Sequence, residues 1–191
     1  ASKDAGSLTV GNGAALGTGA LSVEGAGTLN SSSAVTLNNN VILNANLTAG
    51  GANALALGGG ISGGNGLIKT GASSLTLNGS NTYTGTTALN AGSLIVGSST
   101  ALGTGTLNAS NGTTLDASTA ATLANNVNLG GTLTLGGSNA LTLGGVVAGI
   151  GGLTKNGAAD LILNGANTYF GNTALNTGKL TVGSNTALGS G

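Results

Sequence analysis

The stretch from Gly152 to Gly183 reads GLTKNGAADLILNGANTYFGNTALNTGKLTVG, and it decides the fold. An earlier copy, GLIKTGASSLTLNGSNTYTGTTALNAGSLIVG, runs from Gly66 to Gly97, displaced by 86 positions without a gap. In both copies, short apolar runs that alternate with polar residues are separated by turn signals such as Asn-Gly and Asn-Thr-Gly. Runs this short between turn residues predict β-strands and no helix.

The displacement of 86 residues also holds outside these two stretches. Residues 6–21 match residues 92–107, and the same pattern returns at residues 178–191. A gapless internal match of this length indicates a tandem array. One continuous β-solenoid is therefore predicted for residues 1–191, and its units are expected at 6–91, 92–177 and, in part, 178–191.

Alternation within each run predicts which side chains face the core. From Ser74 to Asn78 the two leucines share one side of a strand and Thr76 takes the other, so we expect the leucines inside. About twelve runs fit one unit, and three strands per coil then give about four coils of roughly 21 residues. The predicted fold is all-β, a single-stranded right-handed parallel β-helix (β-solenoid) of about nine coils.

Two details of this fold are also predicted. One run of each unit is expected to be a strand centred on a tyrosine, Tyr83 in the first copy. The Asn78-Gly79 and Asn164-Gly165 pairs are expected to form corners at which glycine takes a positive φ.

The composition agrees with a thin solenoid and argues against several other classes. The chain has 39 glycines, no proline and no cysteine, and only 4% of its residues are charged. Glycine without a three-residue period excludes collagen, and the aliphatic content is too high for disorder. The formal net charge is zero with four scattered lysines, so no basic patch is present to bind nucleic acid. No run is long enough to be a transmembrane segment.

Few residues could carry chemistry. Asp116 and Asp160 are the best candidates for a carboxylate pair, but the first unit has Asn30 and Ser74 in their places, and we interpret them as a chance pair of surface acids. Lys69 and Lys155 are interpreted as solvated lysines in polar turns. No catalytic, cofactor-binding or metal-binding residue is predicted, and we expect no enzyme. A carbohydrate-active β-helix enzyme remains as an alternative with little support.

The pattern GLxKxGxxxLxLNGxNTYxGxTxLNxGxLxVG resembles the passenger-associated transport repeat of bacterial autotransporters, also described as the autotransporter-associated β-strand repeat. The resemblance covers residues 66–97 and 152–183, about half of the chain together with the Ala-Leu-Gly stretches that follow them. The residues chosen as its structural signature are Lys69, Gly71, Leu75, Leu77, Asn81, Tyr83 and Gly85, then Lys155, Gly157, Leu161, Leu163, Asn167, Tyr169 and Gly171.

This resemblance implies a structural segment of a secreted protein at the bacterial cell surface. It would act as a stiff spacer or adhesin stalk that aids its own export by folding coil by coil. Adhesion or biofilm formation, through a host or cell-surface ligand, would then depend on another region. The recurring tyrosines, Tyr83 and Tyr169, are interpreted as packing across coil corners. The alternative interpretation is that they stack on sugars.

A second function stays open. The 86-residue register could continue from one copy of the chain into the next, because uncapped solenoid ends expose unpaired strand edges. The alternative is therefore an extracellular filament or matrix subunit that associates with itself, end to end or laterally.

Overall fold

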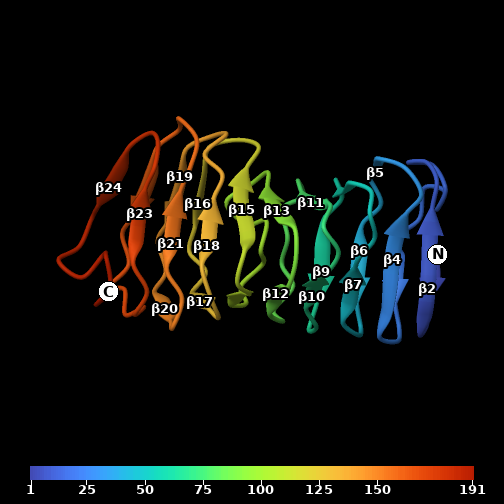
Figure 1. The fold of residues 1–191 in the computed structure, drawn as a ribbon. Coiled ribbons are helices and arrows are strands. Elements are labelled where there is room, and N and C mark those ends of the chain that lie inside the picture. Colours follow the sequence, from blue (N-terminus) through green and yellow to red (C-terminus); the bar gives the residue numbers. More distant parts are fainter.

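The computed structural model describes residues 1–191, and its regular elements are all β-strands. Most strands are three residues long, because alternating triplets such as Leu-Thr-Leu are bounded by glycine, asparagine and serine. The chain winds into stacked coils, and the N- and C-termini lie at opposite ends of the stack (Figure 1). All strand pairs are parallel. The prediction of a parallel β-solenoid of about nine coils is confirmed.

Each coil has three sides, which we call the first, second and third faces. The second face is one eight-stranded sheet made of β2 (Gly6–Val10), β4 (Gly27–Ser31), β7 (Leu47–Ala49), β10 (Leu67–Lys69), β12 (Thr87–Leu89), β14 (Leu107–Ala109), β17 (Val127–Leu129) and β20 (Val147–Gly149). The third face is another, made of β5 (Val35–Leu37), β8 (Leu55–Leu57), β11 (Ser74–Leu77), β13 (Ser93–Val96), β15 (Thr113–Ala117), β18 (Leu133–Leu135), β21 (Leu153–Lys155) and β23 (Thr173–Leu175).

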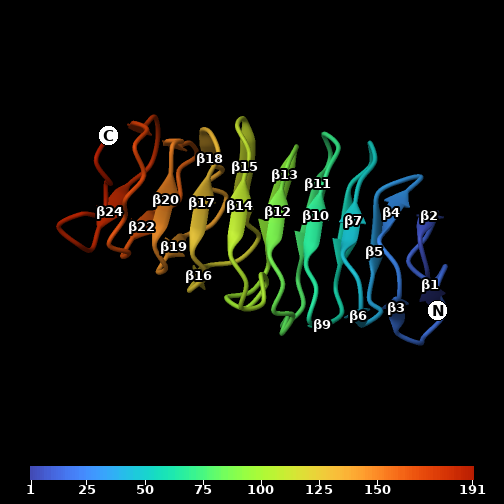
Figure 2. The same cartoon turned by 90° about the horizontal axis from the view of Figure 1, so that it is seen from below.

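The first face contains two four-stranded sheets, whose strands are labelled in the view from below in Figure 2. One consists of β1 (Ser2–Lys3), β3 (Leu21–Val23), β6 (Val41–Leu43) and β9 (Ile61–Gly63). The other consists of β16 (Ala121–Leu123), β19 (Leu141–Leu143), β22 (Leu161–Leu163) and β24 (Leu180–Val182). Between the two sheets the chain around Tyr83 bonds to its neighbours without forming a strand.

The strand predicted at Tyr83 was therefore wrong. The backbone here still follows the coil, since Thr82 N–H donates to the Ile61 carbonyl oxygen at 2.8 Å. The Ile61 N–H, however, donates to the side-chain oxygen of Asn81 at 2.8 Å. A side-chain amide thus takes the place of a backbone carbonyl in the ladder, which interrupts the regular pairing that defines a strand.

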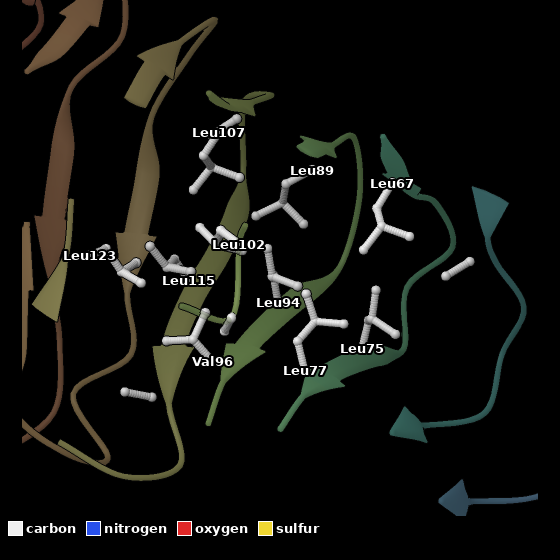
Figure 3. Packing of buried hydrophobic residues seen from close by; sticks show 14 of the residues in the cluster. Leu67, Leu75, Leu77, Leu89, Leu94, Val96, Leu102, Leu107, Leu115 and Leu123 are labelled. Carbon is white, nitrogen blue, oxygen red and sulfur yellow. The ribbon is translucent and has the colours of Figure 1, made fainter. Parts of the chain in front are cut away.

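The core is a thin column of aliphatic side chains inside the coils. Strand after strand alternates buried, partly exposed and buried, as in β8, β18 and β22. Forty buried hydrophobic residues form one cluster along the stack. Figure 3 shows Leu89 of the second face and Leu94 of the third face directed into the same interior. The leucines lie inside as alternation predicted, because successive side chains in a strand point to opposite sides.

The coil is shorter than predicted from the sequence, and as a result the two copies of the repeat begin on different faces of the solenoid. On the second face Leu47 pairs with Leu67, Leu67 with Thr87 and Thr87 with Leu107, so one coil takes 20 residues. An 86-residue unit is therefore four coils and six further residues, and these six carry the chain to the next face. Accordingly β10 lies on the second face, whereas β21, the same segment one unit later, lies on the third. The predicted coil of about 21 residues was therefore wrong by one residue, and the prediction of four coils per unit left out the six residues that lead to the next face.

The Asn-Gly pairs also differ from prediction. Gly79 and Gly165 do not have a positive φ. A Cβ added to either residue would lie 2.2 Å from a carbonyl oxygen of the preceding coil, that of Gly59 or Gly145. These glycines are needed because two coils approach closely, not because the backbone turns into the left-handed region.

Candidate functional site

The signature of each repeat begins with a lysine on the inner side of a strand. Lys69 ends β10 on the same inward side as Leu67, and only 2% of Lys69 is exposed. Its Nζ donates hydrogen bonds to the carbonyl oxygens of Thr70 at 2.7 Å and Gly71 at 2.8 Å. A third bond, of 3.3 Å, reaches the carbonyl oxygen of Ala91 in the next coil. Burial lowers the pKa of Lys69.

Lys155 repeats this arrangement one unit later. Its Nζ donates to the carbonyl oxygens of Asn156 at 2.6 Å and Gly157 at 2.7 Å, and to that of Thr177 in the next coil at 3.4 Å. Burial lowers the pKa of Lys155. The interpretation of Lys69 and Lys155 as solvated lysines was wrong, because corner carbonyls replace water around each ammonium group.

The signature asparagines connect three successive coils. Asn81 is buried, and its Oδ1 accepts the bond from Ile61 N–H described above. On the other side its Nδ2 donates to the Ala101 carbonyl oxygen at 2.6 Å. Asn167 makes the two equivalent bonds one unit later, to Val147 and Ala187. Each amide is thereby satisfied between the coil before it and the coil after it, as a buried polar group requires.

The signature tyrosines are buried as well. Tyr83 is fully buried, and its hydroxyl lies 2.6 Å from the Thr87 hydroxyl. Burial raises the pKa of Tyr83 to about 12, against the opposing effect of the hydrogen bond to Thr87. Tyr169 pairs with Thr173 at 2.5 Å, and burial also raises its pKa. Neither ring is at the surface, so the sugar-stacking interpretation was wrong.

The signature glycines and leucines allow the coils to turn and to stack. Gly71 and Gly157 have φ of +77° and +75°, a conformation that favours glycine. A Cβ on Gly85 would lie 2.3 Å from the backbone of Asn65 in the preceding coil, and one on Gly171 would lie 2.5 Å from the backbone of Gly151. The four signature leucines belong to the core: Leu75, Leu77, Leu161 and Leu163.

The two predicted acids do not share a face. Asp116 belongs to β15 on the third face, whereas Asp160 directly precedes β22 on the first face. The Asp116 carboxylate accepts hydrogen bonds from the backbone N–H of Ser138 at 3.0 Å and from its hydroxyl at 2.5 Å. Asp160 lies 3.9 Å from Lys179 Nζ in an exposed ion pair. The charges of both acids also partly oppose the lowering of the Lys155 pKa.

Sequence reasoning missed two further buried amides. Asn39 Nδ2 donates to the carbonyl oxygens of Gly17 at 2.8 Å and Gly19 at 2.7 Å. Asn125 Nδ2 makes the equivalent pair of bonds one unit later. The signal was available, because both residues open an Asn-Asn-Val triplet and lie 86 positions apart.

These features define a class: a tandem-repeat parallel β-solenoid in which the recurring polar residues bind the backbone of neighbouring coils. The repeats themselves are passenger-associated transport repeats, since the sequence model of that repeat matches residues 67–96 and 153–182. The predicted resemblance is thereby confirmed. No curated protein and no solved structure matches the chain. The structure holds no helix of the length and apolarity needed to cross a membrane.

The repeat and the solenoid together support a structural segment similar to an autotransporter passenger. The repeat suggests a secreted or cell-surface protein. Every signature residue described above is engaged in packing or in hydrogen bonds between coils.

Proposed function

We propose that this segment is a stiff extracellular spacer that helps its own export by folding coil by coil. The observation that carries the proposal is the continuity of bonding between coils. Eight-stranded ladders run along the second and third faces, two shorter ladders lie on the first face, and the buried amides of Asn81 and Asn167 add bonds where the strands are interrupted. Contact with a host or cell-surface ligand, and any part in adhesion or biofilms, is assigned to another region of the protein.

Folding by single coils supports the export role. Each coil gains most of its burial and hydrogen bonds from the adjacent coil, so a folded stack can grow by one coil at a time. A coil that has folded outside the cell does not re-enter a narrow pore, and each addition therefore favours outward movement. The chain has no cysteine and so no disulfide that would cross-link it before export.

The export role is tested by two variants of one strand. Leu94→Ser places a hydroxyl in the core, whereas Ile95→Ser changes the neighbouring outward-facing side chain of β13. In pulse-labelled cells that export the full protein, we expect Leu94→Ser to slow the appearance of the segment to external protease, and Ile95→Ser to leave it unchanged. Equal export rates for both variants and the natural chain would contradict the export role.

The spacer role predicts a rod. At about 4.8 Å per coil, nine coils span roughly 43 Å. Small-angle scattering of the purified segment should give an elongated particle of about this length. A compact sphere of the same mass would contradict the spacer.

Self-association is a second candidate, favoured by one observation. Within residues 1–191, strands β23 and β24 are edge strands of their sheets, and Leu175 and Val182 on them are about half exposed. An open parallel edge can pair with a strand of another copy. Sedimentation of the purified segment tests self-association. A mass that grows with concentration supports it, and a constant monomer mass contradicts it.

A further inference from the structure

The coil corners after β10 and β21 are lined by backbone carbonyl groups that point at one nitrogen atom. At the first corner two of the three acceptors belong to the corner itself and the third to the next coil. The second corner has the same composition. No carboxylate pairs with either lysine, since the ion pair of the structure joins Lys179 to Asp160.

We propose that each of these corners is a binding site for one primary ammonium group, formed by three carbonyl oxygens and filled by the side chain of Lys69 or Lys155. An ammonium group has three N–H donors and no acceptor, so three carbonyl oxygens satisfy it completely. Bonds from a charged donor are stronger than bonds between neutral groups, and they offset the desolvation of the charge. We call these two arrangements the ammonium sites.

The surrounding backbone leaves space for this group. At the second ammonium site a Cβ added to Gly137 would lie 2.7 Å from Lys155 Nζ, so a side chain there would press on the ammonium. The N-terminal corner follows the same design in reduced form. Lys3 Nζ donates to the carbonyl oxygens of Asp4 at 2.7 Å and Gly6 at 2.8 Å. A planar guanidinium has five donors and cannot be satisfied by three converging acceptors, so arginine at these positions would leave buried donors without partners.

The ammonium sites are completed by the chain that follows. Ala91 and Thr177 each lie 22 residues after the lysine that they bind. Before the next coil stacks, two acceptors are in place and the ammonium group is open to water on its remaining side. Stacking of the next coil supplies the third acceptor and buries the charge. The site therefore links the closure of one coil to the arrival of the next.

The first experiment measures amine reactivity in the natural sequence. The purified folded segment is treated with an acylating reagent, and modification of each lysine is followed by mass spectrometry. Lys179, whose side chain is 68% exposed, serves as the internal standard. We expect Lys69 and Lys155 to react at least about tenfold more slowly than Lys179, because reaction needs local opening, and to match it in denaturant. Equal rates in the folded protein would overturn the proposal.

The second experiment refills an emptied site. Lys69→Ala removes the side chain from Cγ to Nζ, and n-propylammonium has the same atoms. We expect the unfolding temperature of Lys69→Ala to rise more in n-propylammonium chloride than in tetramethylammonium chloride at equal concentration, because the second cation has no N–H donor. Lys179→Ala is the matched control, and it should respond to both salts alike.

Equal responses of Lys69→Ala to the two salts would overturn the proposal. If that variant does not fold, the reactivity of the natural lysines still decides. Both experiments use purified protein and do not depend on export, so a failure of the ammonium sites and a failure of the export role are separate results.

Discussion

The two transport repeats share one sequence pattern but differ in burial at their C-terminal parts. Leu89 of the first copy is fully buried, whereas its equivalent Leu175 is 51% exposed. Val96 is also fully buried, and its equivalent Val182 is 50% exposed. In the first copy β14 pairs with β12 and covers Leu89, while β23 pairs with β21 alone.

This difference shows that a repeat does not contain its own core. The strand residues of one copy become buried only when the following coil stacks on them, and the N-terminal residues of both copies, such as Lys69 and Lys155, are equally buried because a coil follows each. The burial of a residue in this fold, and hence its contribution to stability, therefore depends on the neighbouring coils more than on its position in the motif.

The largest expected effect comes from truncating the equivalent leucines. Leu89→Ala should lower the free energy of unfolding by about 3 kcal/mol, because it leaves a cavity in the core. Leu175→Ala should cost less than about 1 kcal/mol, since half of that side chain is already in water. Urea unfolding followed by circular dichroism measures both losses. Similar losses for the two variants would contradict the comparison.

The signature asparagines should not show this difference. Asn81 and Asn167 are both buried and bonded on both sides, so Asn81→Ala and Asn167→Ala should each lower the free energy of unfolding by about 2 kcal/mol. The same urea titration applies, with the outward-facing Thr76→Ala as control. A much smaller loss at Asn167 would contradict this expectation. It would mean that the incomplete packing around Leu175 also weakens the part of the second copy that precedes it.

Alkaline pH should separate the two tyrosines. The pKa of Tyr83 is about 12 in the folded chain and about 10 when unfolded, so its stabilising contribution is complete below pH 10 and is lost as the pH rises towards 12. We expect stability to fall by about 1 to 2 kcal/mol over this range. Tyr83→Phe should reduce the fall more than Tyr169→Phe, because the partner of Tyr169 is less buried. Thermal unfolding at a series of pH values tests this, and an unchanged slope in Tyr83→Phe would contradict it.

The smallest effect is expected at the ion pair that only the second copy has. Asp160 and Lys179 replace Ser74 and Ser93 of the first copy. Because both side chains are exposed, the double variant Asp160→Ser with Lys179→Ser should change the free energy of unfolding by less than about 0.5 kcal/mol. A larger loss in the urea titration would show that surface charge also distinguishes the copies.

Much of the fold could be predicted from the sequence, because alternation of apolar and polar residues determines which side of a strand is buried. The inward leucines of β11 follow directly from this rule. The same rule places Lys69 inside with Leu67, but the usual solvation of lysine argued against it. The carbonyls that bind Lys69 come partly from a residue 22 positions later, and such a contact has no local sequence signal.

The coil length was harder to predict for a similar reason. Runs of three residues predict strands well, but the length of a coil also depends on how many residues each corner takes. Pairing on the third face steps by 19 residues from Leu75 to Leu94 and by 21 from Leu94 to Leu115, around the usual 20. An error of one residue per coil accumulates over four coils, which was enough to hide the change of face.

That change of face gives the rod the symmetry of a screw. Each unit advances four coils and turns by one of the three faces, so three units return a given motif to the same face after 13 coils, or about 62 Å. Identical motifs therefore follow a spiral around the axis instead of forming a row. A flat partner lying along one side meets a given motif only once in three units, and an array built in this way presents the same average surface in every direction.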